Sequence, residues 1–145
     1  MNARVRQRGQ ALVEMGLVVL LFTVLTLGIV DFGRMLMILN VVTHAARDGA
    51  RAASVTSSDA WMGGTLSGTA LATIEDRVHT QLATVLGPDD ASAFTVTPAL
   101  ADVGGIIGQE VSVTVSGTVP YLFGFSGIWG GDVAVNRVAT FRFEG

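Results

Sequence analysis

The chain has 145 residues, 50% of them hydrophobic, and this length allows one domain together with a membrane anchor. It contains no cysteine, which excludes a disulfide, a thiol nucleophile and a thiolate metal site. Its net charge is −3, and an acidic chain without a basic cluster argues against a nucleic-acid partner.

The N-terminus combines a basic leader with a long apolar run. Arg4, Arg6 and Arg8 precede the run Gln10–Val30, which contains no lysine or arginine. As a helix with a rise of about 1.5 Å per residue, this run would extend roughly 31 Å, close to the roughly 30 Å hydrocarbon core of a bilayer. The arginines before the run predict a cytoplasmic N-terminus and an extracytoplasmic C-terminus.

Three kinds of segment share this pattern: a secretory signal, a plain anchor and a pilin-type leader. The run is longer than a secretory apolar region and ends in a poor cleavage site, Ile29–Phe32. A plain anchor gains nothing from the acid Glu14, which would only reach back to the membrane interface. Cleavage after Gly9 would instead free an α-amine on Gln10, and Glu14 of one subunit could pair with the Gln10 amine of its neighbour.

The helical pattern continues from Phe32 to Ala53 without proline, and this distal half is amphipathic. One side gathers the polar residues Asn40, His44, Arg47, Asp48 and Arg51. Two interpretations of this face remain open. It is a solvated surface on which Asp48 and Arg51 pair, or it contacts neighbouring subunits or partner proteins. Glycine within a helix costs about 1 kcal/mol relative to alanine, so Gly49 indicates a close contact.

After the first helix we expect a loop and a second helix. Ser54–Thr69 is rich in serine, threonine and glycine. Within it, Trp61 and Met62 form either a plug over the core or a partner contact. Ala70–Leu86 has an apolar stripe at helical spacing and ends at Gly87 and Pro88.

The remaining chain predicts strands at Phe94–Thr97, Glu110–Val119 and Asp132–Glu144. Because Arg137 falls on the apolar parity of the last strand, we expect a bulge near Asn136. The glycine-aromatic segment Tyr121–Gly131 either closes the core or forms an exposed apolar patch. The expected fold is α+β, with a long N-terminal helix, a second helix and a small antiparallel sheet of about three strands.

Motifs for chemistry are weak. The two histidines, His44 and His79, lack the spacing of a metal site, and Asp89 with Asp90 is better interpreted as a solvated turn. The segment around Ser126 has an incomplete nucleophile elbow without the helix that should follow. We therefore expect no catalytic, cofactor-binding or metal-binding residue and no enzymatic activity.

Three sequence blocks carry a family resemblance: RGQALVEMGL from Arg8, GIVDFGR from Gly28 and AARDGARAA from Ala45. Together they resemble the TadE-like pilin family of the tight-adherence (Tad, type IV-like) secretion and pilus systems. Met15 stands where an aromatic residue is usual, and Leu20 where many members have proline. The resemblance covers roughly the first third of the chain.

The resemblance implies three segments: a basic leader over residues 1–9, a transmembrane helix over 10–31, and an extracytoplasmic pilin-like α+β head over 32–145. It implies a minor pilin or pseudopilin that supports surface attachment, is cut by prepilin peptidase between Gly9 and Gln10, and uses Glu14 for assembly. Its partners would be other pilin-like subunits, the peptidase, an inner-membrane assembly platform and lipid.

The expected location is the bacterial inner membrane, with a single pass, before any transfer to a surface pilus. The alternative is a single-pass anchored extracytoplasmic binding module that never enters a filament. The sequence leaves open the position in the apparatus and the adhesion target.

Overall fold

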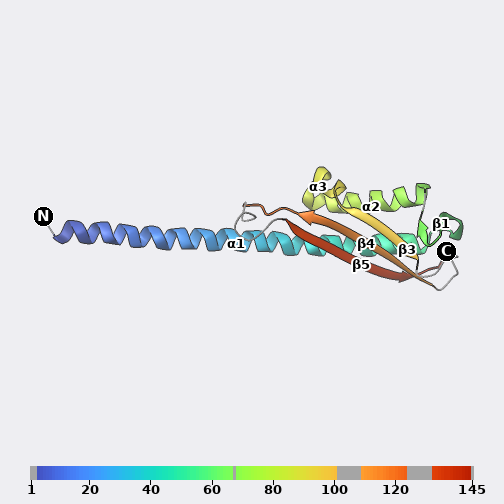
Figure 1. The fold of residues 1–145 in the computed structure, drawn as a ribbon, viewed down its shortest axis with the longest axis horizontal. Coiled ribbons are helices and arrows are strands. Elements are labelled where there is room, and N and C mark those ends of the chain that lie inside the picture. Colours follow the sequence, from blue (N-terminus) through green and yellow to red (C-terminus); the bar gives the residue numbers. More distant parts are fainter. Residues whose placement is uncertain (1–2, 67, 101–108, 124–131, 145) are drawn as a thin grey trace. The chain divides into compact units, whose positions relative to one another are not determined.

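The computed structural model describes residues 3–66, 68–100, 109–123 and 132–144. Its elements in chain order are α1 (Ala3–Ser54), η1 (Ser58–Ala60), β1 (Trp61–Met62), β2 (Thr65–Leu66), α2 (Gly68–Leu86), α3 (Pro88–Ser92), β3 (Thr95–Leu100), β4 (Glu110–Val119) and β5 (Val133–Arg142) (Figure 1). The chain divides into two compact units, Met1–Met35 and Leu36–Gly145, which we call the N-terminal and C-terminal units.

The N-terminal unit consists of the first part of α1, which is helical as the sequence predicted. Two hydroxyl groups interrupt its apolar run. Thr23 donates a 2.8 Å hydrogen bond to the carbonyl oxygen of Val19, and Thr26 donates one of the same length to Phe22. Both bonds span one helical turn, so these hydroxyls find partners without water.

Two helices supply one layer of the C-terminal unit. The part of α1 that belongs to this unit buries six apolar residues to 1% exposure or less: Ile38, Val42, Ala45, Ala46, Ala50 and Ala53. On α2, the buried residues Ile74, Val78 and Leu82 are each four positions apart, which places them on one face of the helix. The helix ends at Gly87, whose φ of 89° is a conformation that glycine adopts without a Cβ penalty.

The second layer is an antiparallel sheet of five strands in the order β1-β2-β3-β4-β5. The central strand β4 alternates as predicted: Val111, Val113 and Val115 are fully buried, whereas Ser112 and Thr114 between them are half-buried. The fold is therefore α+β, with the core between one face of the sheet and the helices.

Two glycines mark where the layers approach closely. A Cβ atom at Gly49 of α1 would lie 3.0 Å from Cγ2 of Val78 on α2 and 3.4 Å from Cγ1 of Val113 on β4. The close contact predicted at Gly49 is confirmed, and it joins α1, α2 and β4. A Cβ atom at Gly117 of β4 would lie 2.6 Å from Cδ1 of Phe94, so this ring covers the backbone of the strand.

The segment expected as a plain loop contains two additional strands. β1 and β2 pair across Gly63 and Gly64, which have positive φ angles, and Thr65 pairs with Ala99 of β3. The sheet therefore has five strands rather than about three. Each added strand is two residues long, too short to show an alternating pattern in the sequence.

The two apolar residues of that segment differ in burial. Trp61 is 8% exposed, and its ring meets that of Phe143 edge to face, with centroids 6.3 Å apart and an interplanar angle of 87°. Met62 is 66% exposed. The plug interpretation is thus correct for Trp61 and wrong for Met62.

The bulge expected near Asn136 is absent from β5. The β4–β5 register is continuous from Glu110↔Arg142 to Val119↔Val133. Arg137 does lie on the parity of the buried valines, opposite Val115, but it is exposed. Because β5 is the last strand of the described sheet, the side chain reaches solvent without a bulge, and an inward-pointing charge of this kind discourages unwanted edge pairing.

Two further boundaries differ from the prediction. Asp89 and Asp90, expected in a turn, form the first turn of α3. The strand predicted at Phe94–Thr97 instead spans Thr95–Leu100. Most of the segment Tyr121–Gly131, including Ser126, lies outside the described residues.

Candidate membrane and assembly surfaces

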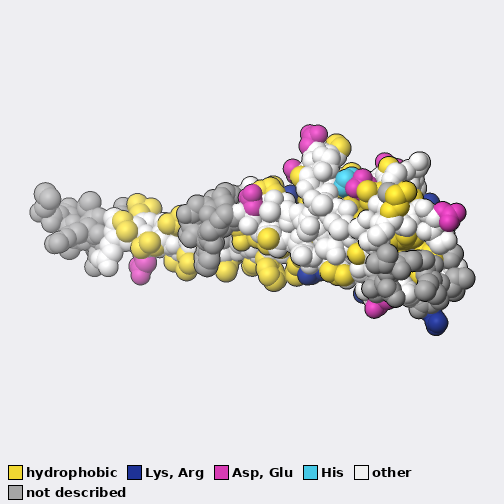
Figure 2. Space-filling model, turned by 45° about the vertical axis from the view of Figure 1, so that its right-hand side comes forward, with side chains coloured by type: hydrophobic (Ala, Val, Ile, Leu, Met, Phe, Trp, Pro, Cys, Tyr) yellow, Lys and Arg dark blue, Asp and Glu magenta, His cyan; other side chains and the backbone are white. Residues whose placement is uncertain are grey.

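The N-terminal unit carries large apolar side chains on its surface. Leu12, Leu21 and Phe22 are 74%, 71% and 68% exposed, and Figure 2 shows hydrophobic side chains along the surface of this part of α1. Among the described residues, α1 is the one helix that is long and apolar enough to cross a membrane. Each fully buried Leu or Phe side chain gains about 1.5–3 kcal/mol over an exposed one, so this surface requires lipid or other helices around it.

Glu14 lies on this apolar helix, and its side chain is exposed. Gln10 precedes it by four residues and therefore lies on the same face of α1, one turn earlier. Gly9 is also exposed, and nothing lies within 4 Å of a Cβ atom built on it. The predicted cleavage point and the predicted assembly acid thus stand within about one and a half turns of a single helix.

The predicted polar face of α1 belongs to the C-terminal unit. All five of its residues are exposed: Asn40, His44, Arg47, Asp48 and Arg51. The small residues on the other side of the helix are buried against the sheet and α2. The sequence pattern therefore located the free surface of the helix correctly. Its role in contacts between subunits stays a prediction.

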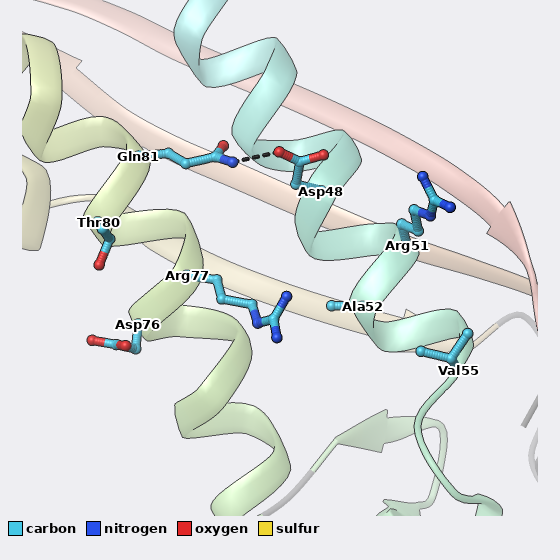
Figure 3. A pocket seen from close by; sticks show the side chains of 8 residues that line it. All are labelled: Asp48, Arg51, Ala52, Val55, Asp76, Arg77, Thr80 and Gln81. Carbon is cyan, nitrogen blue, oxygen red and sulfur yellow. Dashed lines mark hydrogen bonds between the residues drawn. The ribbon is translucent and has the colours of Figure 1, made fainter.

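A groove of about 530 Å³ runs between this face and α2. From α1 it is lined by Asp48, Arg51, Ala52 and Val55, and from α2 by Asp76, Arg77, Thr80 and Gln81 (Figure 3). The amide of Gln81 donates a hydrogen bond to Asp48, while Arg77 extends toward Ala52 and Asp76 points away from α1. Within the described residues Asp48 forms no ion pair with Arg51 of the same helix. Asp48 instead links α1 to α2 through its hydrogen bond with Gln81.

A second groove, of about 330 Å³, separates α1 from β5. Thr43 and Arg47 line it from the helix, and residues 138–141 line it from the strand. Val138 and Phe141 in this segment are 60% and 39% exposed. The polar face of α1 is thus bordered by α2 on one side and by the edge of the sheet on the other.

In the part of the chain that the structure describes, no group of three histidine, cysteine or acidic side chains could hold a metal ion. The Nε2 atom of His79 lies 2.9 Å from the carbonyl oxygen of Phe94, which ties α2 to the start of β3. The surfaces that stand out in the described residues are apolar or charged.

Both of these surfaces of α1 lie in a segment that matches a known protein family. Residues 9–51 match the family model of TadE-like proteins. This N-terminal segment is therefore similar to TadE-like proteins. Its match begins at Gly9, includes Glu14 and ends at Arg51, so it covers the apolar helix and the polar face described above. No curated protein and no solved structure matches the chain.

The one long apolar helix among the described residues agrees with a single membrane anchor. Two residues that meet the TadE-like helix lie outside the matched segment: Arg77 and Gln81 on α2. Sequence reasoning missed both. Their spacing of four residues, beside the buried stripe of α2, was the available signal, but it does not indicate which neighbour they face.

Proposed function

We propose that the chain is a structural minor pilin or pseudopilin of a tight-adherence pilus assembly and secretion apparatus, supporting surface attachment. The observation that carries this proposal is an exposed carboxylate, Glu14, on an apolar helix whose TadE-like match starts at Gly9. In lipid an isolated acid is unfavourable by about 2.5–3.5 kcal/mol at the bilayer centre and less toward either end. A pairing role explains why it is present.

Processing would supply the partner of Glu14. Prepilin peptidase cuts between Gly9 and Gln10, and the new α-amine of Gln10 then carries a positive charge. On its own helix this amine lies one turn from Glu14, but in a bundle of such helices the two groups of neighbouring subunits can meet. The subunit sits in the inner membrane with its C-terminal unit outside, and an ATPase-driven platform extracts it into the assembly.

The first test is the mature N-terminus, read by mass spectrometry on protein purified from membranes. We expect a chain that begins at Gln10. A Gly9→Leu variant should accumulate as the uncut precursor, because the bulky side chain no longer fits next to the scissile bond. Wild-type protein that keeps its leader, or normal processing of Gly9→Leu, would contradict this part of the proposal.

The second test concerns assembly. Glu14→Ala and Glu14→Gln should both insert and be cut, but incorporation into the apparatus should fall. Removing one member of a buried ion pair costs about 3–5 kcal/mol, which corresponds to a loss of a hundredfold or more. The amine can deprotonate to relieve part of this cost, since an α-amino group titrates near pH 8, and the defect would then be smaller. Wild-type assembly by both processed variants would favour the plain anchored module.

A further inference from the structure

The C-terminal unit carries opposite charges on its two flanks. On one flank, Arg47 of α1 and Arg137 of β5 are both exposed. The groove beside Arg47 is lined by Thr43 and residues 138–141, none of them acidic. We call this surface, with Val138 and Phe141, the basic flank.

The opposite flank belongs to α2 and α3. Glu75 and Asp76 lie on α2, and Asp89 and Asp90 form the first turn of α3. Asp76, Asp89 and Asp90 are exposed, and Glu75 is half-buried. Figure 2 shows acidic side chains gathered over α3. We call these four residues the acidic flank.

The fold explains why the two charges separate. On α2, Arg77 and Gln81 line the groove toward α1, and Asp76 borders the same groove but points away from α1 (Figure 3). His79, four residues after Glu75, bonds to Phe94 on the other side of the helix. Since α1 borders β5 while α2 packs with α3 and β3, the two flanks lie at opposite edges of the unit. Asp48, the acid nearest Arg47 in the chain, keeps its charge but points toward α2, where the Gln81 amide donates a hydrogen bond to it (Figure 3).

We propose that neighbouring copies of this chain dock side by side, with the basic flank of one copy on the acidic flank of the next; this rests on the function proposed above. The two surfaces differ, so the contact is heterologous and can propagate into a filament rather than close into a dimer. Complementary charges bring the flanks together and fix their register, while Val138 and Phe141 supply apolar area at the contact.

Cysteine cross-linking tests the geometry, because the chain has no cysteine of its own. Thr140→Cys places a thiol on the basic flank and Ser92→Cys one beside the acidic flank, both at exposed positions. In membranes holding the full chain, a mild oxidant should convert the double variant into a ladder of multimers. Each single variant should give monomer and at most dimer. A double variant that gives no ladder while wild type assembles would overturn the docking proposal.

Charge reversal tests the chemistry in the same cross-linking assay. Arg47→Glu with Arg137→Glu gives a chain that is acidic on both flanks, and Asp76→Arg with Asp89→Arg gives one that is basic on both. Each alone should yield about tenfold less multimer, as expected from the loss of several exposed ion pairs. Asp59→Arg, at an exposed position outside both flanks, is the matched control and should leave the ladder unchanged.

Rescue separates this proposal from general damage and from the function proposed above. Coexpression of the two reversed chains should restore the ladder, because alternating copies again present opposite charges at every contact. Ladders of wild-type intensity from each reversed chain alone, or no rescue on mixing, would overturn the docking proposal. In both cases Glu14-dependent assembly of wild type would still support the pilin function; a wild-type chain that never multimerises would overturn both.

Discussion

The two units use the same apolar residue types in opposite ways. In the N-terminal unit Val18 is 58% exposed and Phe22 is 68% exposed, whereas in the C-terminal unit Val113 and Phe143 are fully buried. The C-terminal unit encloses its core residues with its own sheet and helices, so it needs no other molecule to bury that core, although single apolar side chains such as Val138 stay exposed. The N-terminal unit has no such cover, and its helix depends on lipid or on other helices.

The largest effects are expected from a valine-to-aspartate substitution placed in each unit, because it should disturb folding in the C-terminal unit and membrane insertion in the N-terminal unit. Val113→Asp puts an unpaired carboxylate where α1, α2 and β4 meet. An uncompensated buried charge costs about 3–5 kcal/mol, a large part of the roughly 5–15 kcal/mol that stabilises a domain. We expect the C-terminal unit to lose protease resistance while the chain still inserts into membranes.

Val18→Asp is the matched variant in the N-terminal unit. It should leave the C-terminal unit resistant to protease but weaken insertion, since a central acid costs about 2.5–3.5 kcal/mol in the bilayer. Carbonate extraction measures insertion, and trypsin digestion in detergent measures folding. Protease resistance in Val113→Asp would contradict the β4 register, and loss of protease resistance in Val18→Asp would contradict the division into two separate units.

A smaller effect is expected where Phe94 covers β4. Gly117→Ala would place a methyl group 2.6 Å from the Phe94 ring, and overpacking of this kind costs about 1–3 kcal/mol. The urea midpoint of the C-terminal unit in detergent should fall accordingly. Phe94→Leu in the same chain should recover part of the loss, because the smaller side chain leaves room. An unchanged midpoint in Gly117→Ala would mean that Phe94 packs elsewhere.

The elements that sequence reasoning predicted well have long, regular patterns. The apolar run of α1, the buried stripe of α2 and the alternation in Glu110–Val119 each repeat often enough to define a period, and each forms the expected structure. The free face of α1 was located correctly for the same reason. Its five polar residues fall on one side of the helix, opposite the buried apolar or small residues Ile38, Val42, Ala46 and Ala53.

The errors have a common physical origin in contacts that are distant in sequence. β2 joins the sheet through the pairing of Thr65 with Ala99 of β3. Since β1 and β2 are each two residues long, their own sequence cannot predict this distant pairing. The bulge was inferred on the assumption that an inward-facing position must be buried. At the last strand of the sheet that assumption fails, and Arg137 reaches solvent from the inner face. The bond between Gln81 and Asp48 likewise depends on the packing of two helices.

The smallest effect is expected at Gly49, where two contributions oppose each other. Gly49→Ala favours the helix by up to about 1 kcal/mol, because glycine is the poorer helix former. The new Cβ atom, however, would lie 3.0 Å from Cγ2 of Val78, and relieving that contact costs about 1–3 kcal/mol.

The net loss of stability from Gly49→Ala should therefore be about 0–2 kcal/mol, measured by urea unfolding of the C-terminal unit in detergent. Val78→Ala is destabilising alone because it leaves a cavity. Combined with Gly49→Ala, the new methyl group enters that space and the helix gains its propensity. The double variant should then be more stable than the sum of the two single changes predicts, by about 0.5–3 kcal/mol as for residues in contact. Strict additivity would contradict a contact between α1 and α2 at Gly49, and with it the close packing that distinguishes this part of α1 from its exposed N-terminal part.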